Sequence, residues 1–150
     1  MYATGNQPVV PVQNVETAVA RRSVTGRRIR RRGAVILKYV QSSNAKRMRD
    51  GSFYTTFKGR RWLAINHPHI NSLIAEGFWE EHDAGLIVYC HYPQKGWKVS
   101  FYENPLRNDT PDMSEIAAAL GGGGHRGAAG AWIGYCPFDG TECVLKDKED

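Results

Sequence analysis

The feature that most limits how this chain can fold is a run of four consecutive glycines, Gly121 to Gly124, followed directly by His125 and Arg126. One glycine is enough to end a helix, because glycine takes positive φ angles without steric cost. Four in a row also leave the backbone N–H groups uncovered, and successive N–H groups form a concavity that suits an anion, most often phosphate. The run therefore predicts a phosphate-binding loop with His125 and Arg126 as side-chain donors. The alternative is a flexible linker, against which the flanking apolar residues argue.

A short helix is expected to lead into the glycines. Asp112 can cap its first turn, and Glu115 completes a capping box. Apolar residues then recur at helical spacing and form one apolar face, which consists of Met113, Ile116, Ala117 and Leu120. We expect the helix to end at the glycines. If the AAG at residues 128–130 opens a second helical turn, its free N–H groups strengthen the attraction for an anion.

The rest of the pattern predicts an α/β domain with a mixed sheet of about five strands and flanking helices. Helices are expected over residues 33–50 and from Pro68 to His82. The predicted strands cover residues 53–57, 61–65, 86–91, 97–102 and 131–136. Within residues 97–102, alternation places Lys98, Ser100 and Tyr102 on one polar face, which is a candidate wall for a ligand site. Residues 146–150 are expected to form a charged, frayed tail.

The positive charge is concentrated near the N-terminus. The whole chain carries +5, whereas residues 1–50 hold eleven Lys and Arg against two acids, a balance of +9, which leaves −4 for residues 51–150. Seven arginines lie between Arg21 and Arg32. This basic arm predicts contact with nucleic-acid phosphates, with a solvated linker, a localisation signal or an organellar transit segment as alternatives.

Metal binding is not favoured by the sequence. Cys90, Cys136 and Cys143 make an odd count and are expected to be reduced thiols. Cys136 and Cys143 lack a second pair that would complete a zinc site. His67 and His69 are expected to be surface or capping residues. No stretch is long and apolar enough for a membrane span and no signal peptide is visible, so we expect a cytoplasmic protein, or an organellar one, without a membrane partner.

The stretch SEIAAALGGGGHRGAAG resembles the signature of the DHH-associated domain, the C-terminal substrate-binding half of DHH phosphoesterases such as oligoribonucleases (nanoRNases) and single-strand-specific exonucleases. The segments GAVILKY, LAINHPHINSLIAEGF and LIVYCHYPQKGWKVSFYEN agree more weakly, and the resemblance spans about residues 33–135. It implies the same α/β fold. Together with the charge pattern it divides the chain into four expected parts: a basic, mobile arm over residues 1–32, a linker helix over 33–50, the substrate-binding domain over 51–138 and a charged tail over 139–150.

In that family the catalytic work belongs to a separate N-terminal domain, which holds manganese through aspartates and histidines that include a DHH triplet. Nothing in this chain matches that triplet, and Glu81-His82-Asp83 lacks the clustered carboxylates of a two-metal site. The family also offers a substrate-binding arginine in a VSLRS-like stretch, where this chain has VSFYE with Tyr102 at the arginine position. Tyr102 therefore replaces a bidentate phosphate donor with a phenol, whose ring can stack on a base. Arg126 and Arg107 are candidates to compensate for the missing arginine.

Three functions remain open from the sequence. The first is a stand-alone domain that binds the phosphate of a nucleotide or of single-stranded nucleic acid, is not catalytic alone and needs no cofactor. Its binding residues would be Gly121, Gly122, Gly123, Gly124, His125, Arg126, Ser100 and Tyr102. The second is one subunit of a split phosphoesterase, whose partner protein carries the catalytic, manganese-binding domain. The third is a degenerate domain that serves as a structural part of a ribonucleoprotein assembly.

Overall fold

The computed structural model describes residues 33–36, 38–68 and 73–149 of this chain. The predicted basic arm over residues 1–32 lies outside the described residues. The chain divides into two compact units, residues 1–40 and 41–150. Residues 33–36 and 38–40 are helical in the first unit, and residues 41–51 are helical in the second. No helix within the described ranges has the length and apolar character needed to cross a membrane.

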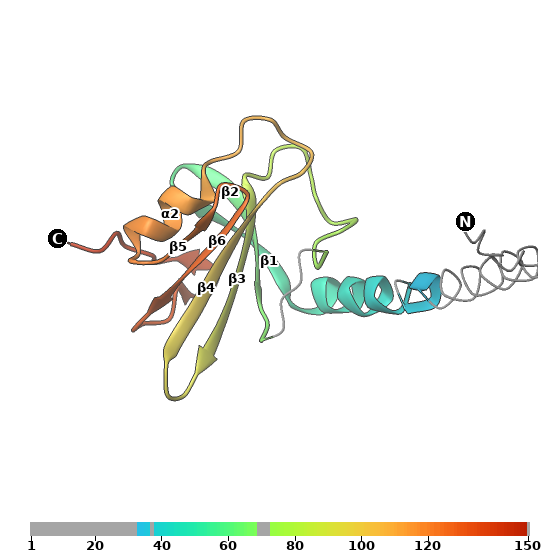
Figure 1. Ribbon diagram of the computed structural model, residues 1–150, viewed down its shortest axis with the longest axis horizontal. Helices are drawn as coiled ribbons and strands as arrows, with labels where there is room; N and C mark the ends of the chain where they lie inside the picture. Colours follow the sequence, from blue (N-terminus) through green and yellow to red (C-terminus); the bar gives the residue numbers. More distant parts are fainter. Residues whose placement is uncertain (1–32, 37, 69–72, 150) are drawn as a thin grey trace, which may run out of the picture. The chain divides into compact units, whose positions relative to one another are not determined.

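The second unit is built on a mixed sheet of six strands in the order β1-β2-β3-β4-β6-β5 (Figure 1). The strands are β1 (Ser52–Phe57), β2 (Arg60–Asn66), β3 (Gly85–Tyr92), β4 (Gly96–Glu103), β5 (Gly123–His125) and β6 (Ala128–Ile133). β2 and β3 are parallel, and every other neighbouring pair is antiparallel. A small second sheet pairs β7 (Phe138–Asp139) with β8 (Glu142–Cys143). The predicted mixed α/β architecture is confirmed, with six strands in the main sheet instead of about five.

The predicted helix from Pro68 to His82 is wrong over the residues that the structure describes there. Residues 73–78 form turns with i→i+3 hydrogen bonds, such as the one from Glu76 N–H to Leu73 O at 3.1 Å. Gly77 has φ +83°, a left-handed conformation that interrupts a helix. Ile74 still buries its side chain, because consecutive turns can bring apolar residues to the core without a continuous helix.

Apolar side chains form two clusters, one on each face of the sheet, because neighbouring residues of a strand point to opposite faces. Trp62 and Ala64 of β2 belong to the first cluster, whereas Leu63 and Ile65 belong to the second. The first cluster extends under α2 (Met113–Ala119), which buries Met113, Ile116 and Ala117.

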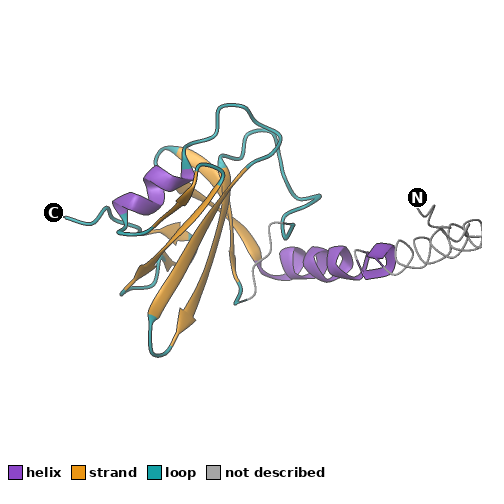
Figure 2. Ribbon diagram, viewed as in Figure 1, coloured by secondary structure: helices purple, strands orange, loops and turns teal. Residues whose placement is uncertain are grey.

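The predicted start of α2 is confirmed. Asp112 is the N-cap, and its side chain accepts a hydrogen bond of 2.9 Å from the backbone N–H of Ser114. Figure 2 shows α2 beside the two strands that form the β5–β6 end of the sheet. α2 therefore covers the β4–β6–β5 end of this face of the sheet.

The opposite face is covered over β2 and β3 only. Met48 of the helical residues 41–51 and Ile74 of the β2–β3 connection pack there against Leu63, Leu86 and their neighbours. Tyr102 of β4 lies at the border of this cluster. On β6 the same face carries Trp132, which is 45% exposed. The β4–β6–β5 end of this face is thus open in the described part of the chain.

The charged tail is not frayed over the residues that the structure describes. The phenol oxygen of Tyr135 accepts a hydrogen bond of 2.9 Å from Lys146 N–H, and Ala119 O accepts one of 2.7 Å from Lys148 N–H. We call residues 144–149 the C-terminal strap. The bond to Ala119 O holds the strap against the end of α2, because the last carbonyls of a helix lack partners within the helix, and the bond to Tyr135 holds the strap near the end of β6.

Candidate functional site

The first two glycines of the run close α2. Gly121 has φ +85°, and its N–H donates to Ala118 O at 2.9 Å. The N–H of Gly122 donates to Ala117 O at 2.8 Å, which completes a Schellman pattern. Both N–H groups therefore bond to the helix. This hydrogen bonding does not favour the anion-binding role predicted for Gly121 and Gly122.

The rest of the run is an edge strand and not a loop. β5 pairs with β6 through Gly123↔Gly130, Gly124↔Ala129 and His125↔Ala128. Arg126 and Gly127 form the two-residue turn between these strands. Residues 128–130 do not open the second helical turn that would have strengthened anion binding, because this reversal places them in β6, between β5 and β4.

Packing explains the absence of a side chain at Gly122 and Gly124. A Cβ at Gly122 would lie 2.1 Å from Gly130 O, and a Cβ at Gly124 would lie 2.6 Å from Ala129 Cα. Gly124 also has φ +148°. At Gly123 a Cβ would meet nothing within 4 Å. Gly123 is therefore the one glycine of the run whose missing side chain neither packing nor backbone conformation explains.

Gly123 lies on the floor of a hollow in the open face of the sheet. Ser100, Gly130 and Gly123 are paired in one row across β4, β6 and β5, and residues paired in this way point to the same face. Because two of the three are glycines, this row is lower than the rows on either side. The hollow has a volume of about 360 Å³ and is lined by Lys98, Ser100, Tyr102, Gly123, Gly124, Ala128, Ala129, Gly130, Ala131 and Trp132.

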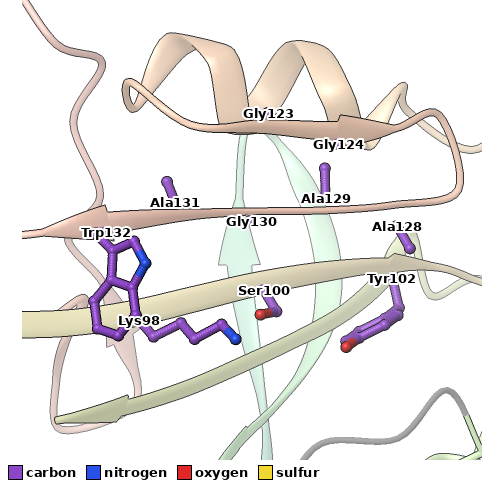
Figure 3. A pocket seen from close by; sticks show the side chains of 10 residues that line it. All are labelled: Lys98, Ser100, Tyr102, Gly123, Gly124, Ala128, Ala129, Gly130, Ala131 and Trp132. Carbon is purple, nitrogen blue, oxygen red and sulfur yellow. The ribbon is translucent and has the colours of Figure 1, made fainter. Parts of the chain in front are cut away.

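The side chains of this face stand on the two sides of the glycine row. Figure 3 shows Lys98, Ser100, Tyr102 and Trp132 pointing away from α2, whereas Ala129 points toward it. Tyr102 forms one wall, and Lys98 and Trp132, which are paired across β4 and β6, form the other. The hollow thus combines an ammonium group, two aromatic rings and exposed glycine backbone.

The polar groups of the hollow are suited to donate hydrogen bonds. Burial raises the pKa of Tyr102 above its ordinary value of 10.0, so the phenol stays protonated at neutral pH. Ser100 is only 7% exposed, and its Oγ would lie 3.3 Å from a Cβ at Gly130. The hydroxyl therefore faces the glycine floor. Lys98 is exposed and brings a positive charge to the rim.

The structure brings together four of the eight predicted site residues. Ser100, Tyr102, Gly123 and Gly124 line the hollow. His125 is exposed and does not line it, although its register with Ala128, and through Ala128 with Tyr102, places it on the same face.

Neither of the two candidate arginines, Arg126 and Arg107, lines the hollow, and each has an acidic partner. The guanidinium of Arg126 lies 3.6 Å from the carboxylate of the cap residue Asp112. Arg107 donates to Asp109 from Nε at 2.7 Å and from Nη2 at 2.8 Å, which lowers the pKa of Asp109 to about 2. The cation in the hollow is Lys98, which the sequence placed on the polar face but not among the site residues.

Gly130 and Trp132 were missed by the sequence analysis. The signal for them is the alternation in residues 128–133, where buried Ala129, Ala131 and Ile133 alternate with more exposed residues. Because residues 128–130 were considered as a helical turn, the alternation typical of a strand over residues 128–133 was not recognised.

The described residues contain no group of three or more His, Cys, Asp or Glu side chains that could hold a metal ion. In the Glu81-His82-Asp83 stretch, Asp83 is fully buried and accepts a hydrogen bond of 2.7 Å from Arg61 Nε. Its carboxylate therefore has a structural partner. Cys90, Cys136 and Cys143 are free thiols.

No model of a known protein family matches this chain, and no curated protein matches it. One similar solved structure is the pGpG-specific phosphodiesterase PggH from Vibrio cholerae, with 12% identity and a TM-score of 0.49 over 62% of this chain and 33% of that chain. Another is an uncharacterized protein from Helicobacter pylori G27, with 22% identity and a TM-score of 0.43 over 67% of this chain and 26% of that chain. This chain therefore spans a third or less of the length of these proteins. A phosphodiesterase neighbour is compatible with the resemblance to the DHH-associated domain, but with TM-scores below 0.5 neither similarity carries an argument about function.

Proposed function

We propose that this domain binds the phosphate-bearing end of a nucleotide or of single-stranded nucleic acid in the hollow between Tyr102 and Trp132, and that it does not hydrolyse the ligand alone. The observation that carries the proposal is Gly123. It is a glycine without a packing reason, and it lies on the floor of a hollow whose walls are a lysine and two aromatic rings. Close approach of a ligand to the backbone would explain why this position has no side chain.

The walls fit the two parts of a nucleotide. The ammonium of Lys98 and the hydroxyls of Ser100 and Tyr102 can donate to phosphate oxygens. Trp132 is 45% exposed, and a base can stack on its ring. His125 lies on the same face as Tyr102, and its imidazole can donate to an anion that extends beyond the hollow.

The residues that line the hollow fit a site that binds a phosphate without hydrolysing it. Phosphoryl hydrolysis of the kind carried out by DHH phosphoesterases needs metal ions that polarise the phosphate and activate water. The residues around the hollow are lysine, serine, tyrosine, tryptophan, glycine and alanine, which are not the carboxylate and imidazole ligands of such metals.

Calorimetric titration with the nucleotide dTMP, and with the nucleoside thymidine as the matched ligand without phosphate, tests the proposal. We expect the nucleotide to bind more tightly than the nucleoside. Lys98→Gln should weaken nucleotide binding about ten-fold or more, because hydrogen bonds to charged groups contribute more than neutral ones. Lys46→Gln, which removes an exposed lysine from the helix at residues 41–51, is the control and should leave the affinity unchanged. Equal binding of nucleotide and nucleoside, or equal binding by wild type and Lys98→Gln, would contradict the proposal.

A second candidate follows from the resemblance to the DHH-associated domain. The chain would be the substrate-binding subunit of a split phosphoesterase, and a separate protein would carry the catalytic domain with its manganese. This candidate rests on the resemblance, together with the finding that the described residues contain no group of three or more His, Cys, Asp or Glu that could hold a metal ion. Purification of the native complex tests it: co-purification of a protein with clustered aspartates and histidines, together with manganese-dependent nuclease activity, is the expected result. A native complex without that activity would exclude this candidate.

A further inference from the structure

The cations of residues 51–149 fall into two groups. Lys58 and all the arginines in this range lie within 4 Å of a carboxylate, in the pairs Lys58–Asp147, Arg60–Asp109, Arg61–Glu80, Arg61–Asp83, Arg107–Asp109 and Arg126–Asp112. The lysines that have no such pair among the described residues are Lys95, Lys98, Lys146 and Lys148.

All four of these lysines lie around Trp132. The ammonium of Lys95 is 5.6 Å from the centroid of the Trp132 ring. Lys98 is paired with Trp132 across β4 and β6. Lys146 and Lys148 line, together with Trp132, a second hollow of about 300 Å³. Trp132 is therefore a wall that the two hollows share, and the lysines of residues 51–149 that have no carboxylate partner are gathered at this wall.

The backbone of the C-terminal strap is fixed where it forms the second hollow. Lys146 N–H donates to Tyr135 Oη at 2.9 Å, and Lys148 N–H donates to Ala119 O at 2.7 Å. Asp147 lies between these two lysines, and Lys58 Nζ, at 3.4 Å, neutralises its carboxylate. The strap thus presents two positive charges, and the acid between them, Asp147, is already paired, whereas Glu149 follows Lys148 along the chain.

Aromatic surface accompanies the charge. Trp132 is 45% exposed and Tyr135 is 40% exposed, and both line the second hollow. The ring of Tyr92 packs edge-on against Trp132, with centroids 5.3 Å apart, which restrains the orientation of the indole. Lysines that alternate with exposed rings are the combination that binds single-stranded nucleic acid, because bases stack on the rings and phosphates pair with the lysines.

We propose that Trp132, Tyr135, Lys146 and Lys148 form a second subsite, which holds the next nucleotides of a single strand whose phosphorylated end lies in the first hollow. This inference rests on the proposed function and narrows its ligand from a mononucleotide to an oligonucleotide. Residues 51–150 carry a net charge of −4, so the domain surface as a whole repels nucleic acid. The nucleic-acid strand is attracted to the surface where the unpaired lysines gather. The position of these lysines therefore directs the nucleic acid past Trp132.

The test measures how affinity depends on ligand length. The full chain is titrated with dTMP and with a 5′-phosphorylated thymidine trinucleotide at several salt concentrations. We expect the trinucleotide to bind more tightly, and the double variant Lys146→Gln/Lys148→Gln to lose most of this gain while it keeps its affinity for dTMP. The slope of log affinity against log salt for the trinucleotide should fall by about 1.4, since each phosphate contact to a single strand contributes about 0.7. Trp132→Ala should weaken trinucleotide binding at least about five-fold.

The control is Lys46→Gln/Arg49→Gln, which removes two exposed positive charges from the helix at residues 41–51. It should bind the trinucleotide as tightly as wild type at each salt concentration. Equal affinity of wild type for dTMP and the trinucleotide would overturn the second subsite and leave the proposed function in place. Inorganic tripolyphosphate binding as tightly as the trinucleotide would overturn the stacking on Trp132. Failure of both nucleotides to bind would overturn the proposed function and this inference together.

Discussion

The covered and open faces of the β4–β6–β5 end of the sheet are built from the same strands, yet glycine has a different role on each. On the covered face, a Cβ at Gly122 would lie 2.7 Å from the Cβ of Ala131, which is buried under α2. On the open face, a Cβ at Gly123 would meet no atom within 4 Å. Two neighbours in one glycine run therefore have different reasons to be glycine. Gly122 permits close packing, and Gly123 leaves the floor of the hollow without a side chain.

The difference shows that a glycine run is not by itself a phosphate-binding loop. Gly121 and Gly122 end a helix, and Gly124 permits close approach to Ala129. Gly123 alone is left for a ligand to explain. The comparison of the two faces is tested by substitutions that change stability on one face and binding on the other.

The largest effect on folding is expected from Gly122→Ala. The new methyl group would lie 2.1 Å from Gly130 O, so β5 and β6 would have to separate. We expect a loss of about 3 kcal/mol in the free energy of unfolding, measured by urea denaturation, since overpacking a tight contact shifts the backbone. A stability equal to that of wild type would show that the covered face is not closely packed at this point.

Gly121→Ala should have an intermediate effect. Gly121 has φ +85°, and an L-residue with a side chain is strained in this conformation. The nearest atom to a Cβ there is Lys148 Nζ at 3.1 Å, at the flexible end of a side chain, so the strain is conformational and not a clash with backbone. We expect a loss of about 1–2 kcal/mol in the free energy of unfolding. Gly121→Asn, which tolerates positive φ better, should recover part of that loss in the same denaturation experiment.

A pH titration of stability probes the start of α2. The hydrogen bond from the Ser114 side chain holds the pKa of Asp112 below its ordinary value of 3.8. Because the folded-state pKa is lowered, the contribution of Asp112 to stability is present above pH 3.8 and is lost as the pH falls through the folded-state pKa. Asp112→Asn keeps an acceptor for the cap but does not ionise, so the stability difference between wild type and variant should shrink over this acid range. A difference that does not change with pH would contradict this role of the carboxylate.

Gly123→Val should have the smallest effect on folding, since its side chain enters open space in a strand where valine is favoured. The free energy of unfolding should change by no more than about 0.5 kcal/mol. The same variant should lose affinity for dTMP in calorimetric titration, because the valine occupies the floor of the hollow. Unchanged binding would show that the ligand does not approach Gly123. The proposed role of the open face in ligand binding would then be contradicted.

Much of the fold could be predicted from the sequence where a pattern is long and local. The period of two in residues 97–102 and the apolar run at residues 86–91 gave β4 and β3, and Asp112 gave the start of α2. The helix expected from Pro68 to His82 is wrong in its described part. Apolar residues at helical spacing can also be buried by turns, and Gly77 interrupts the helix.

The site was harder to predict than the fold, because it depends on register between strands. Ser100 and Tyr102 were identified from alternation within one strand. Gly130 and Trp132 line the hollow because β6 lies between β4 and β5, and no local pattern states which strands are neighbours. The short β7 and β8 were missed for a different reason, because strands of two residues show no periodicity in the sequence.

The hydrogen bond from Lys148 N–H to Ala119 O makes residues near the C-terminus part of the support for the final turn of α2. Proteolytic trimming before Lys146 would therefore change two properties at once, by removing a helix partner and two positive charges.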